Sequence, residues 1–325
     1  MNLVANILLV GFGSIGRRHY ANLLALGHTA ISVVDPDDSR FIDQPGVRRF
    51  NQELSEQNLA QFNIVFICNP TSAHIPVALL AARAGCHLFI EKPLSHTLEG
   101  ARELALLAIK QKLITMVGCN LRFDPAISKM KELCAAGAAG KILAVYLEYG
   151  RYLPYQRPTV DYRTVYAGKK AMGGGVLLDD IHDFDLLTWF SDQASLEKIQ
   201  IFKAHVSNLE IDVEDIANVV VQFENGIIGS IRCDYLQQYK HRNLKIIGEK
   251  ANLVWEFREN KIWGEYYDQG TERRDLLAAF EQADPNKMYQ DELNYFLSCV
   301  QDKKETFHGV SDAAAEIESL LTAKL

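Results

Sequence analysis

The first third of the chain alternates short apolar runs with longer stretches in which apolar residues recur at helical spacing. Apolar runs of this length predict buried strands, and the stretches between them predict helices that cover a sheet. Strands separated by helices are typical of a doubly wound parallel sheet, whose ligand binds at the carboxyl ends of the strands. The predicted strands are Ile7–Val10, Ala30–Val34, Ile64–Cys68, Leu88–Ile90 and Thr115–Val117, and the predicted helices are Arg17–Leu26, Glu53–Gln61, Ala73–Ala84 and Thr97–Gln111.

The pattern changes after residue 125, where most of the apolar runs read as strands. Asn225-Gly226 lies between two of these runs and is suited to the left-handed conformation of a hairpin turn. This half is therefore predicted to be an antiparallel sheet with few helices against one face. The predicted strands are Ile142–Tyr149, Lys198–His205, Ile216–Phe223, Ile227–Tyr235, Asn243–Ile247 and Asn252–Phe257, and the predicted helices are Ala126–Ala135, Met288–Val300 and Asp312–Ala323.

Length and charge narrow the class of protein. A chain of 325 residues predicts two domains, here residues 1–121 and 122–325. A net charge of -7 argues against nucleic acid or an anionic membrane as the main partner. Because Met1–Ala5 leads directly into the first strand and no apolar run could span a bilayer, we expect neither a signal peptide nor a membrane helix. The scattered cysteines favour reduced thiols in a cytoplasmic protein.

Gly11, Gly13 and Gly16 directly follow the first predicted strand. In a strand, turn and helix unit that binds a dinucleotide, the first glycine permits the sharp turn and the second lets the backbone approach the phosphates. The third glycine lets helix and strand pack closely, and the helix start, here with Ser14 and Ile15, offers unpaired N–H groups to the anion. We therefore predict a dinucleotide site here, rather than a purely structural turn.

Asp35 ends the second predicted strand, at about the distance from the glycine turn, roughly 20 residues, at which dinucleotide-binding units place an acid. A carboxylate at this position accepts hydrogen bonds from the ribose hydroxyls of NAD and repels the 2'-phosphate of NADP. NAD is therefore the predicted cofactor. Arg40 could meet a 2'-phosphate, which keeps NADP as the alternative.

Polar loops follow the next three predicted strands and are expected to converge on one crevice. For His74 the alternative is a residue that caps or packs a helix, and for Lys92 it is a solvated surface amine. A lysine that is followed by proline at a strand end favours a functional role. The residues concerned are Asn69, Pro70 and His74 after the first strand, Glu91 and Lys92 after the second, and Asn120 and Arg122 after the third.

The second half contains one further stretch with chemical potential, residues 173–187, whose apolar positions fit one helical face. Asp179 and His182 stand three residues apart, and Asp183 lies within one turn of Asp179, so these side chains are predicted to be neighbours on a helix. A carboxylate beside an imidazole stabilises the protonated ring and suits proton transfer with a hydroxyl. The alternatives are a metal-pyrophosphate motif of the DDxxD type, which the predicted fold opposes, and a helix cap with a solvated acidic face.

A series of motifs in this chain resembles those of the Gfo/Idh/MocA family, the family of glucose-fructose oxidoreductase and inositol dehydrogenase. They occupy residues 11–16, 68–74, 91–93, 120–125 and 173–182, with further likeness at 246–250 and 289–293. The resemblance implies an N-terminal Rossmann domain and a C-terminal α/β domain built on a large open sheet. It also implies NAD(P)-dependent oxidation or reduction of sugars, cyclitols or their derivatives, by dimers or tetramers formed through the sheet face.

The resemblance also implies roles for single residues. Lys92 would reach nicotinamide ribose and substrate, and Asp179 and His182 would complete the catalytic group. Many members place the acid and the histidine four positions apart with a glycine between, whereas the interval here is three, as in members found with bacterial surface-sugar biosynthesis. This departure leaves Asp179, Asp183 and Asp185 as alternative partners of the histidine. The predicted cofactor-binding residues are Gly11, Gly13, Ser14, Ile15, Gly16, Asp35, Asn69, Pro70, His74, Glu91 and Lys92; the predicted substrate-binding residues are Lys92, Asn120, Arg122, Arg163, Tyr166, Asp179 and His182; no metal site is predicted.

The expected substrate is a polyhydroxylated ring, such as a sugar nucleotide or amino sugar, bound between the two domains. A ring hydroxyl gives its proton to His182 and the attached carbon gives hydride to nicotinamide, while Lys92 favours the alkoxide and Asp179 orients substrate and imidazole. Two alternatives are a non-enzymatic NAD(P)-binding sugar sensor or co-regulator, and redox-assisted glycoside cleavage. Retention of Lys92, Asp179 and His182 favours an enzyme over the sensor. The sugar, the carbon and the direction are not encoded by any motif.

Overall fold

The computed structural model describes residues 5–281 and 284–323 of the chain. The chain forms two compact units, one of Met1–Cys119 with Asn286–Glu318 and one of Asn120–Pro285 with Ser319–Leu325. The predicted domains 1–121 and 122–325 include residues 1–4, 282–283 and 324–325, which lie outside the described residues, as does most of the predicted lead-in Met1–Ala5.

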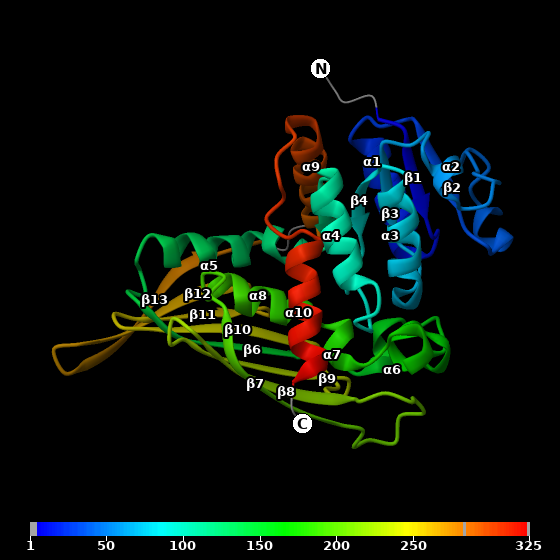
Figure 1. The fold of residues 1–325 in the computed structure, drawn as a ribbon. Helices are drawn as coiled ribbons and strands as arrows, with labels where there is room; N and C mark the ends of the chain where they lie inside the picture. The colour runs from blue at the N-terminus through cyan, green and yellow to red at the C-terminus, as the bar shows by residue number, and fades with distance from the viewer. Residues whose placement is uncertain (1–4, 282–283, 324–325) are drawn as a thin grey trace. The chain divides into compact units, whose positions relative to one another are not determined.

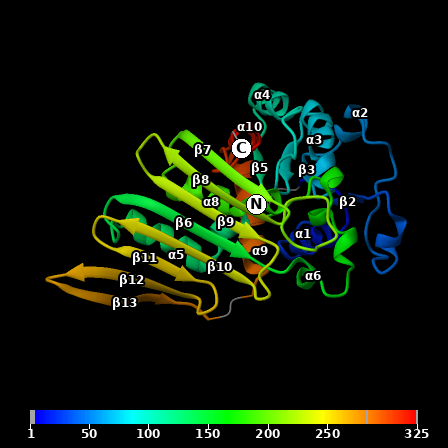
Figure 2. The same ribbon diagram turned by 90° about the horizontal axis from the view of Figure 1, so that it is seen from below.

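The first unit is built on a parallel sheet with the strand order β2-β1-β3-β4-β5, which confirms the predicted doubly wound sheet. Its strands are apolar and almost wholly buried because helices cover both faces. Helices α1 and α9 pack together on one face and α3 and α4 on the other (Figure 2). The elements are β1 (Ile7–Val10), α1 (Ser14–Ala25), β2 (Ile31–Val34), η1 (Asp38–Phe41), α2 (Glu56–Leu59), β3 (Ile64–Ile67), η2 (Thr71–Ala73), α3 (His74–Arg83), β4 (His87–Ile90), α4 (Ala101–Gln111) and β5 (Thr115–Val117).

The chain returns to the first unit near its end, through α9 (Lys287–Asp302) and α10 (Val310–Thr322). Phe296 of α9 packs against the strands, with its ring centroid 5.8 Å from that of Phe66 and 5.5 Å from that of Phe89. Glu292 accepts a hydrogen bond from the backbone N–H of Cys119 at 2.6 Å. The prediction of one boundary near residue 121 therefore differs from the structure, because the apolar face of α9 completes the core of the first unit.

The second unit is built on an eight-stranded sheet with the order β13-β12-β11-β10-β6-β9-β8-β7. Neighbouring strands are antiparallel except for the parallel pair β6 and β9, which confirms the predicted mainly antiparallel sheet. The elements are η3 (Asn120–Phe123), α5 (Pro125–Ala135), β6 (Ile142–Gly150), α6 (Leu153–Gln156), η4 (Tyr162–Thr164), η5 (Tyr166–Gly168), η6 (Lys170–Met172), α7 (Val176–Asp179), α8 (His182–Phe190), β7 (Leu196–Ala204), β8 (Ile216–Phe223), β9 (Ile228–Asp234), β10 (His241–Gly248), β11 (Asn252–Glu256), β12 (Lys261–Asp268) and β13 (Thr271–Ala279).

One face of this sheet carries the helices of the unit. Figure 1 shows α5 and α8 along the same face, where α5 contacts β11, β12 and β13, and α8 contacts β6 and β9. Residues on that face alternate with residues on the other, so Val219 and Val221 are buried while Val220 is 44% exposed. Figure 2 shows the opposite face with the strands in front.

Two strands of the sheet, β12 and β13, are absent from the sequence prediction. The run Thr271–Ala279 begins with charged residues because it forms an exposed edge strand, and such a strand has no regular alternation to detect. The predicted hairpin at Asn225-Gly226 is confirmed, but only Gly226 of the two has a positive φ, +85°. Asn225 instead accepts a hydrogen bond from the backbone N–H of Ile227 at 3.1 Å. Among the described residues no helix combines the length and the apolar character that crossing a membrane requires.

Candidate active site

The glycine turn after β1 has the conformation that the sequence predicts. Gly11 has φ of +96°, and a Cβ there would strike the backbone of Asn69. A Cβ on Gly16 would strike the carbonyl of Gly11 and lie 3.2 Å from Leu9, so close packing of helix and strand depends on this glycine. Gly13 precedes the first turn of α1, whose leading N–H groups have no acceptor within the helix.

Asp35 is buried beside this turn. Its Oδ2 accepts hydrogen bonds from the backbone N–H of Phe12 at 2.6 Å and from Nη1 of Arg40 at 2.9 Å. The same Arg40 nitrogen lies 3.2 Å from where a Cβ of Gly13 would stand. An anion cradle and an acid held next to it are the two features that the pyrophosphate and adenosine ribose of NAD require, so these residues fit that cofactor.

His74 joins two of the strand-end loops. It is buried, with Nδ1 2.9 Å from the carbonyl oxygen of Pro93 and Nε2 2.9 Å from that of Asn69. Burial lowers the pKa of His74, and a neutral imidazole donates from only one of its nitrogens. Pro70 precedes η2 within the same loop. These contacts match the packing alternative for His74, and its contact with a cofactor stays a prediction.

Glu91 and Lys92 follow β4, and both are partly exposed. Glu91 binds Nε2 of the buried His19 at 2.6 Å and lies beside Gly118, at the end of β5. Although burial opposes the effect, the hydrogen bond to His19 and the charges of His19 and Lys92 lower the pKa of Glu91. The end of β4 therefore holds a carboxylate directly before the lysine that the sequence singles out. The Lys92–Pro93 peptide bond is cis.

The prediction of one continuous helix through Asp179 and His182 was wrong. Helix α7 ends at Asp179 and α8 begins at His182, and Asp180 between them has ψ of 35°, outside the helical range. The partners change at the break, since Asp179 binds Tyr166 and Tyr235 whereas Asp180 binds Arg242. Asp179 and His182 are therefore not stacked one turn apart on a single helix.

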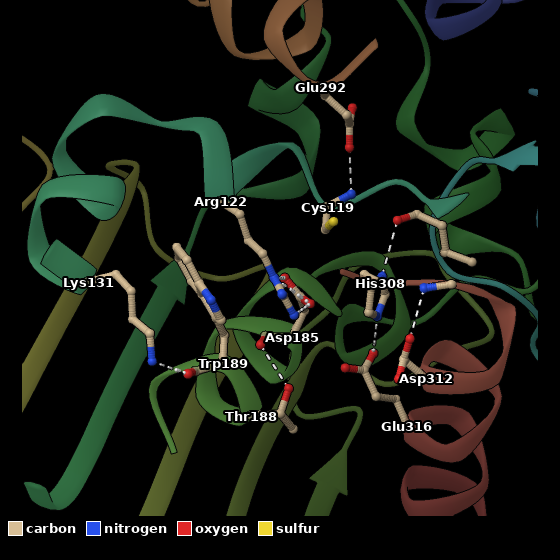
Figure 3. A network of polar contacts seen from close by, with 12 residues as sticks. Cys119, Arg122, Lys131, Asp185, Thr188, Trp189, Glu292, His308, Asp312 and Glu316 are labelled. Atoms are coloured by element: carbon tan, nitrogen blue, oxygen red, sulfur yellow. Dashed lines mark hydrogen bonds and ion pairs between the residues drawn. The ribbon is translucent and has the colours of Figure 1, made fainter. Parts of the chain in front are cut away.

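The aspartates of this segment fall into two kinds. Arg242 donates to both Asp180 and Asp183, which are buried, and burial raises the pKa of Asp183 although Arg242 opposes it. Asp185, also buried, binds Arg122, whose Nε lies 3.1 Å from each carboxylate oxygen (Figure 3). Of the three alternative partners for the histidine, Asp183 and Asp185 are therefore committed to buried arginines.

Asp179 differs from its neighbours because it is only partly buried, as is His182. Its Oδ1 accepts a hydrogen bond from the hydroxyl of Tyr166, and its Oδ2 lies 3.2 Å from the hydroxyl of Tyr235. The segment therefore presents Asp179 and His182 to solvent while its other carboxylates are buried. Such an acid and imidazole can bind a hydroxyl and exchange its proton.

The remaining predicted substrate residues lie in varied surroundings. Asn120 and Arg122 are buried, and the Arg122 guanidinium lies 5.2 Å from the ring of Trp189 (Figure 3). Arg163 is exposed and pairs with Asp161 at 2.9 Å and with Glu210 at 3.1 Å.

Sequence reasoning missed three residues that organise these sites, namely His19, Tyr235 and Arg242. His19 follows Gly16 by one helical turn, which places it on the side of α1 that faces the strands, and this spacing was a usable signal. Tyr235 and Arg242 carry no such signal, because each meets its aspartate across more than fifty residues of chain, 56 for Tyr235 and Asp179.

Two family models match the chain. Residues 5–119 match the description "Oxidoreductase family, NAD-binding Rossmann fold", and residues 127–254 match "GFO/IDH/MocA C-terminal domain". The uncharacterized oxidoreductase YrbE of Bacillus subtilis (strain 168) is 30% identical over 257 residues, which cover 76% of this chain and 72% of that protein. The chain belongs to the Gfo/Idh/MocA family.

Other members of the Gfo/Idh/MocA family are similar at comparable levels. Myo-inositol 2-dehydrogenase of Thermotoga maritima is 29% identical over 264 residues, covering 75% of this chain and 73% of that protein. The structure of a levoglucosan dehydrogenase in complex with NADH aligns with a TM-score of 0.84 at 17% identity, covering 98% of this chain and 94% of that chain, which shows a shared fold.

Family membership confirms the predictions of fold, cofactor and class of activity. The first unit contains an NAD-binding Rossmann domain, and the chain is an NAD-dependent oxidoreductase. The sensor and glycoside-cleavage alternatives do not receive this support.

Proposed function

We propose that this oxidoreductase transfers hydride between NAD and a ring hydroxyl or ketone of a sugar, sugar nucleotide or cyclitol. The biosynthesis of bacterial surface sugars is the proposed role of this reaction. The observation that carries the proposal is the pair Asp179 and His182, partly exposed in a segment whose other acids are buried. An imidazole that acts together with a carboxyl group suits removal of a hydroxyl proton. The named activities of the inositol and levoglucosan dehydrogenases support a polyhydroxylated ring as substrate.

We assign three roles to the catalytic residues. His182 takes the proton of the substrate hydroxyl, and Asp179 orients substrate and imidazole. The positive charge of Lys92 stabilises the alkoxide that develops on the substrate oxygen. NAD, when bound, supplies the hydride acceptor or donor.

Cofactor binding is assigned to the strand ends of the first unit. Gly11, Gly13, Gly16 and the α1 start with Ser14 and Ile15 would hold the pyrophosphate, and Asp35 the adenosine ribose. The nicotinamide part of the cofactor would be bound by Asn69, Pro70, His74, Glu91 and Lys92. NAD is preferred over NADP because Asp35 and Asp37 both pair with Arg40, the residue that could otherwise meet a 2'-phosphate.

The proposed contacts with the substrate are Asn120, Arg122, Arg163 and Tyr166, in addition to Lys92, Asp179 and His182. The structure supports them unequally. Tyr166 already contacts Asp179, whereas Arg122 and Arg163 would have to bind substrate while keeping or releasing their carboxylate partners.

We further propose that the second unit binds the substrate and forms a homodimer or homotetramer through its sheet. Tyr146, Val220 and Ile228, on three neighbouring strands, are 47%, 44% and 41% exposed. Apolar side chains exposed together on an open sheet face favour burial against a second copy. Cytoplasmic location is proposed because the cysteines lack a paired pattern.

Calorimetry with NAD and NADP, followed by absorbance at the NADH band with a panel of sugars, inositols and nucleotide sugars, tests the function. We expect NAD to bind tightly and one compound of the panel to reduce the bound NAD to NADH. Binding with no reduction by any compound would contradict the proposed dehydrogenase and favour a sensor or a redox-neutral reaction.

Lys92→Met tests the assignment of the lysine. We expect NAD affinity to stay the same and turnover to fall by roughly 100-fold or more, because alkoxide stabilisation is lost. Lys110→Met, on the exposed side of α4, is the matched control and should turn over normally. Unchanged turnover in Lys92→Met would remove Lys92 from the mechanism.

A further inference from the structure

Two tyrosines bind opposite oxygens of one aspartate. The hydroxyl of Tyr166, in η5, donates to Oδ1 of Asp179, and the hydroxyl of Tyr235, directly after β9, lies 3.2 Å from Oδ2. The three residues come from separate segments of the second unit. Asp179 itself ends the four-residue helix α7, where the backbone turns away from helical geometry at the next residue.

The two tyrosines occupy different surroundings. Tyr235 is wholly buried, and its hydroxyl is also 3.4 Å from the carbonyl oxygen of Ala167. Burial and the charge of Asp179 raise the pKa of Tyr235 well above its ordinary value, so the hydroxyl keeps its proton and remains a donor. Tyr166 is only partly buried and lines a small pocket, as does Tyr162.

We propose that Tyr166 and Tyr235 are positioning residues that fix the carboxylate of Asp179 for the reaction. Each donates to a different oxygen, so together they set the rotation of the carboxylate plane. A carboxylate oxygen has two lone-pair sites, so a hydrogen bond from a tyrosine does not prevent that oxygen from accepting a second one. Precise orientation of such a group lowers the barrier more than it changes binding. This inference rests on the proposed function of Asp179.

The placement of the tyrosines predicts different kinetic effects. Tyr235 is wholly buried, so its loss should act on turnover and leave KM unchanged. Tyr166 is partly buried and is itself a proposed substrate contact, so its loss should lower turnover and also raise KM. The hydroxyl of Tyr235 can donate its one proton either to Asp179 or to the carbonyl oxygen of Ala167. We therefore expect Tyr235 to contribute less than Tyr166 to the orientation of the Asp179 carboxylate.

Tyr→Phe substitutions in the full-length protein test the proposal. We expect Tyr235→Phe to lower kcat roughly 10-fold and Tyr166→Phe roughly 10- to 100-fold, the range for a lost hydrogen bond to a charged group. KM should change only in Tyr166→Phe, and NAD affinity in neither. Tyr162→Phe is the matched control, because it lines the same pocket but accepts its hydrogen bond from the backbone N–H of Glu210, at 3.3 Å.

A second measurement needs no substrate. Thermal unfolding of Tyr235→Phe, Asp179→Asn and the double variant forms a double-mutant cycle, and a non-zero coupling is expected if the hydroxyl holds the carboxylate. Zero coupling, or unchanged kcat in both tyrosine variants while Asp179→Asn loses turnover, would overturn the positioning role and leave the proposed function intact. Full turnover in Asp179→Asn would instead overturn the catalytic role of Asp179 and the positioning role with it.

Discussion

Four aspartates lie between residues 179 and 185, and burial separates them by role. Asp180, Asp183 and Asp185 are buried and bind Arg242 or Arg122, whereas Asp179 is partly exposed and binds tyrosine hydroxyls. A buried carboxylate that binds an arginine holds the fold, while a partly exposed carboxylate can reach a substrate. The sequence alone does not distinguish the structural aspartates from the candidate catalytic one.

Loss of Arg242 should lower the free energy of unfolding substantially. Arg242→Met keeps much of the side-chain volume but leaves Asp180 and Asp183 buried without their cation, and we expect a loss of about 3–5 kcal/mol of unfolding free energy. Denaturant unfolding measures it. Arg102→Met is the control, because its pair with Glu318 is exposed and should contribute about 1 kcal/mol or less. Equal losses in the two variants would refute the structural role of Arg242.

Cofactor choice is also decided by single residues. Asp35→Asn keeps an oxygen that can accept from Phe12 but loses the charge that repels a 2'-phosphate. We expect the ratio of the NADP Kd to the NAD Kd to fall roughly 10-fold, as measured by calorimetry. Asp38→Asn, exposed and paired with Arg49, should leave the ratio unchanged. An unaltered ratio in Asp35→Asn would exclude Asp35 from cofactor selection.

At the scale of elements, short polar contacts hold the strand ends in place. His74, at the start of α3, ties the loop after β3 to the turn after β4, and His19 of α1 ties itself to Glu91. In the second unit, side chains on each side of the α7–α8 break bind partners on different strands and loops. Apolar patterning predicts the elements, and these contacts decide where they stop.

The buried histidine predicts a pH dependence of stability. Burial lowers the pKa of His74 below its ordinary value of 6.5, so the unfolded chain binds more protons than the folded one as the pH falls below 6.5. Stability should therefore decrease on acidification through this window, by at most about 1.4 kcal/mol per pH unit from this residue. His74→Gln should show a shallower slope in denaturant unfolding between pH 7 and pH 5. Identical slopes would show that His74 does not carry the effect.

At the scale of the whole molecule, the chain leaves its first unit after Cys119 and returns to it at Asn286. The intervening residues 120–285 contain the large sheet. The face of this sheet that carries no helices exposes apolar residues on β6, β8 and β9. An exposed apolar sheet face of this kind is suited to pairing with a second copy.

Charge placed on that face should prevent assembly. We expect the wild-type chain to sediment as a dimer or tetramer and Val220→Arg to sediment as a smaller species, because an arginine there cannot be buried without a partner. Leu106→Arg, at a 64% exposed position of α4, is the control and should not change the mass. A monomeric wild type, or an unchanged mass in Val220→Arg, would contradict the proposed interface.

The sequence by itself determined the doubly wound sheet, the antiparallel sheet, the glycine turn and the family. These depend on local signals: apolar periodicity, glycines that alone fit a turn, and motifs in order along the chain. It also selected Asp35 and Lys92 as candidates, because their chemistry and their position at the ends of predicted strands can be read locally. Asp179 and His182 were selected by their spacing and by the resemblance to the family.

Only the tertiary structure decided which carboxylates are buried, where the helix at Asp180 breaks, and which unit α9 completes. Each depends on a partner far along the chain: Arg242 for Asp180 and Asp183, Tyr235 for Asp179, and Phe66 and Phe89 for Phe296. The edge strand β13 was not predicted for a related reason. Its side chains are mostly exposed, so its sequence has no alternation of apolar and polar residues that would indicate a strand. Contacts between distant residues leave no periodic trace in the sequence, so packing alone fixes them.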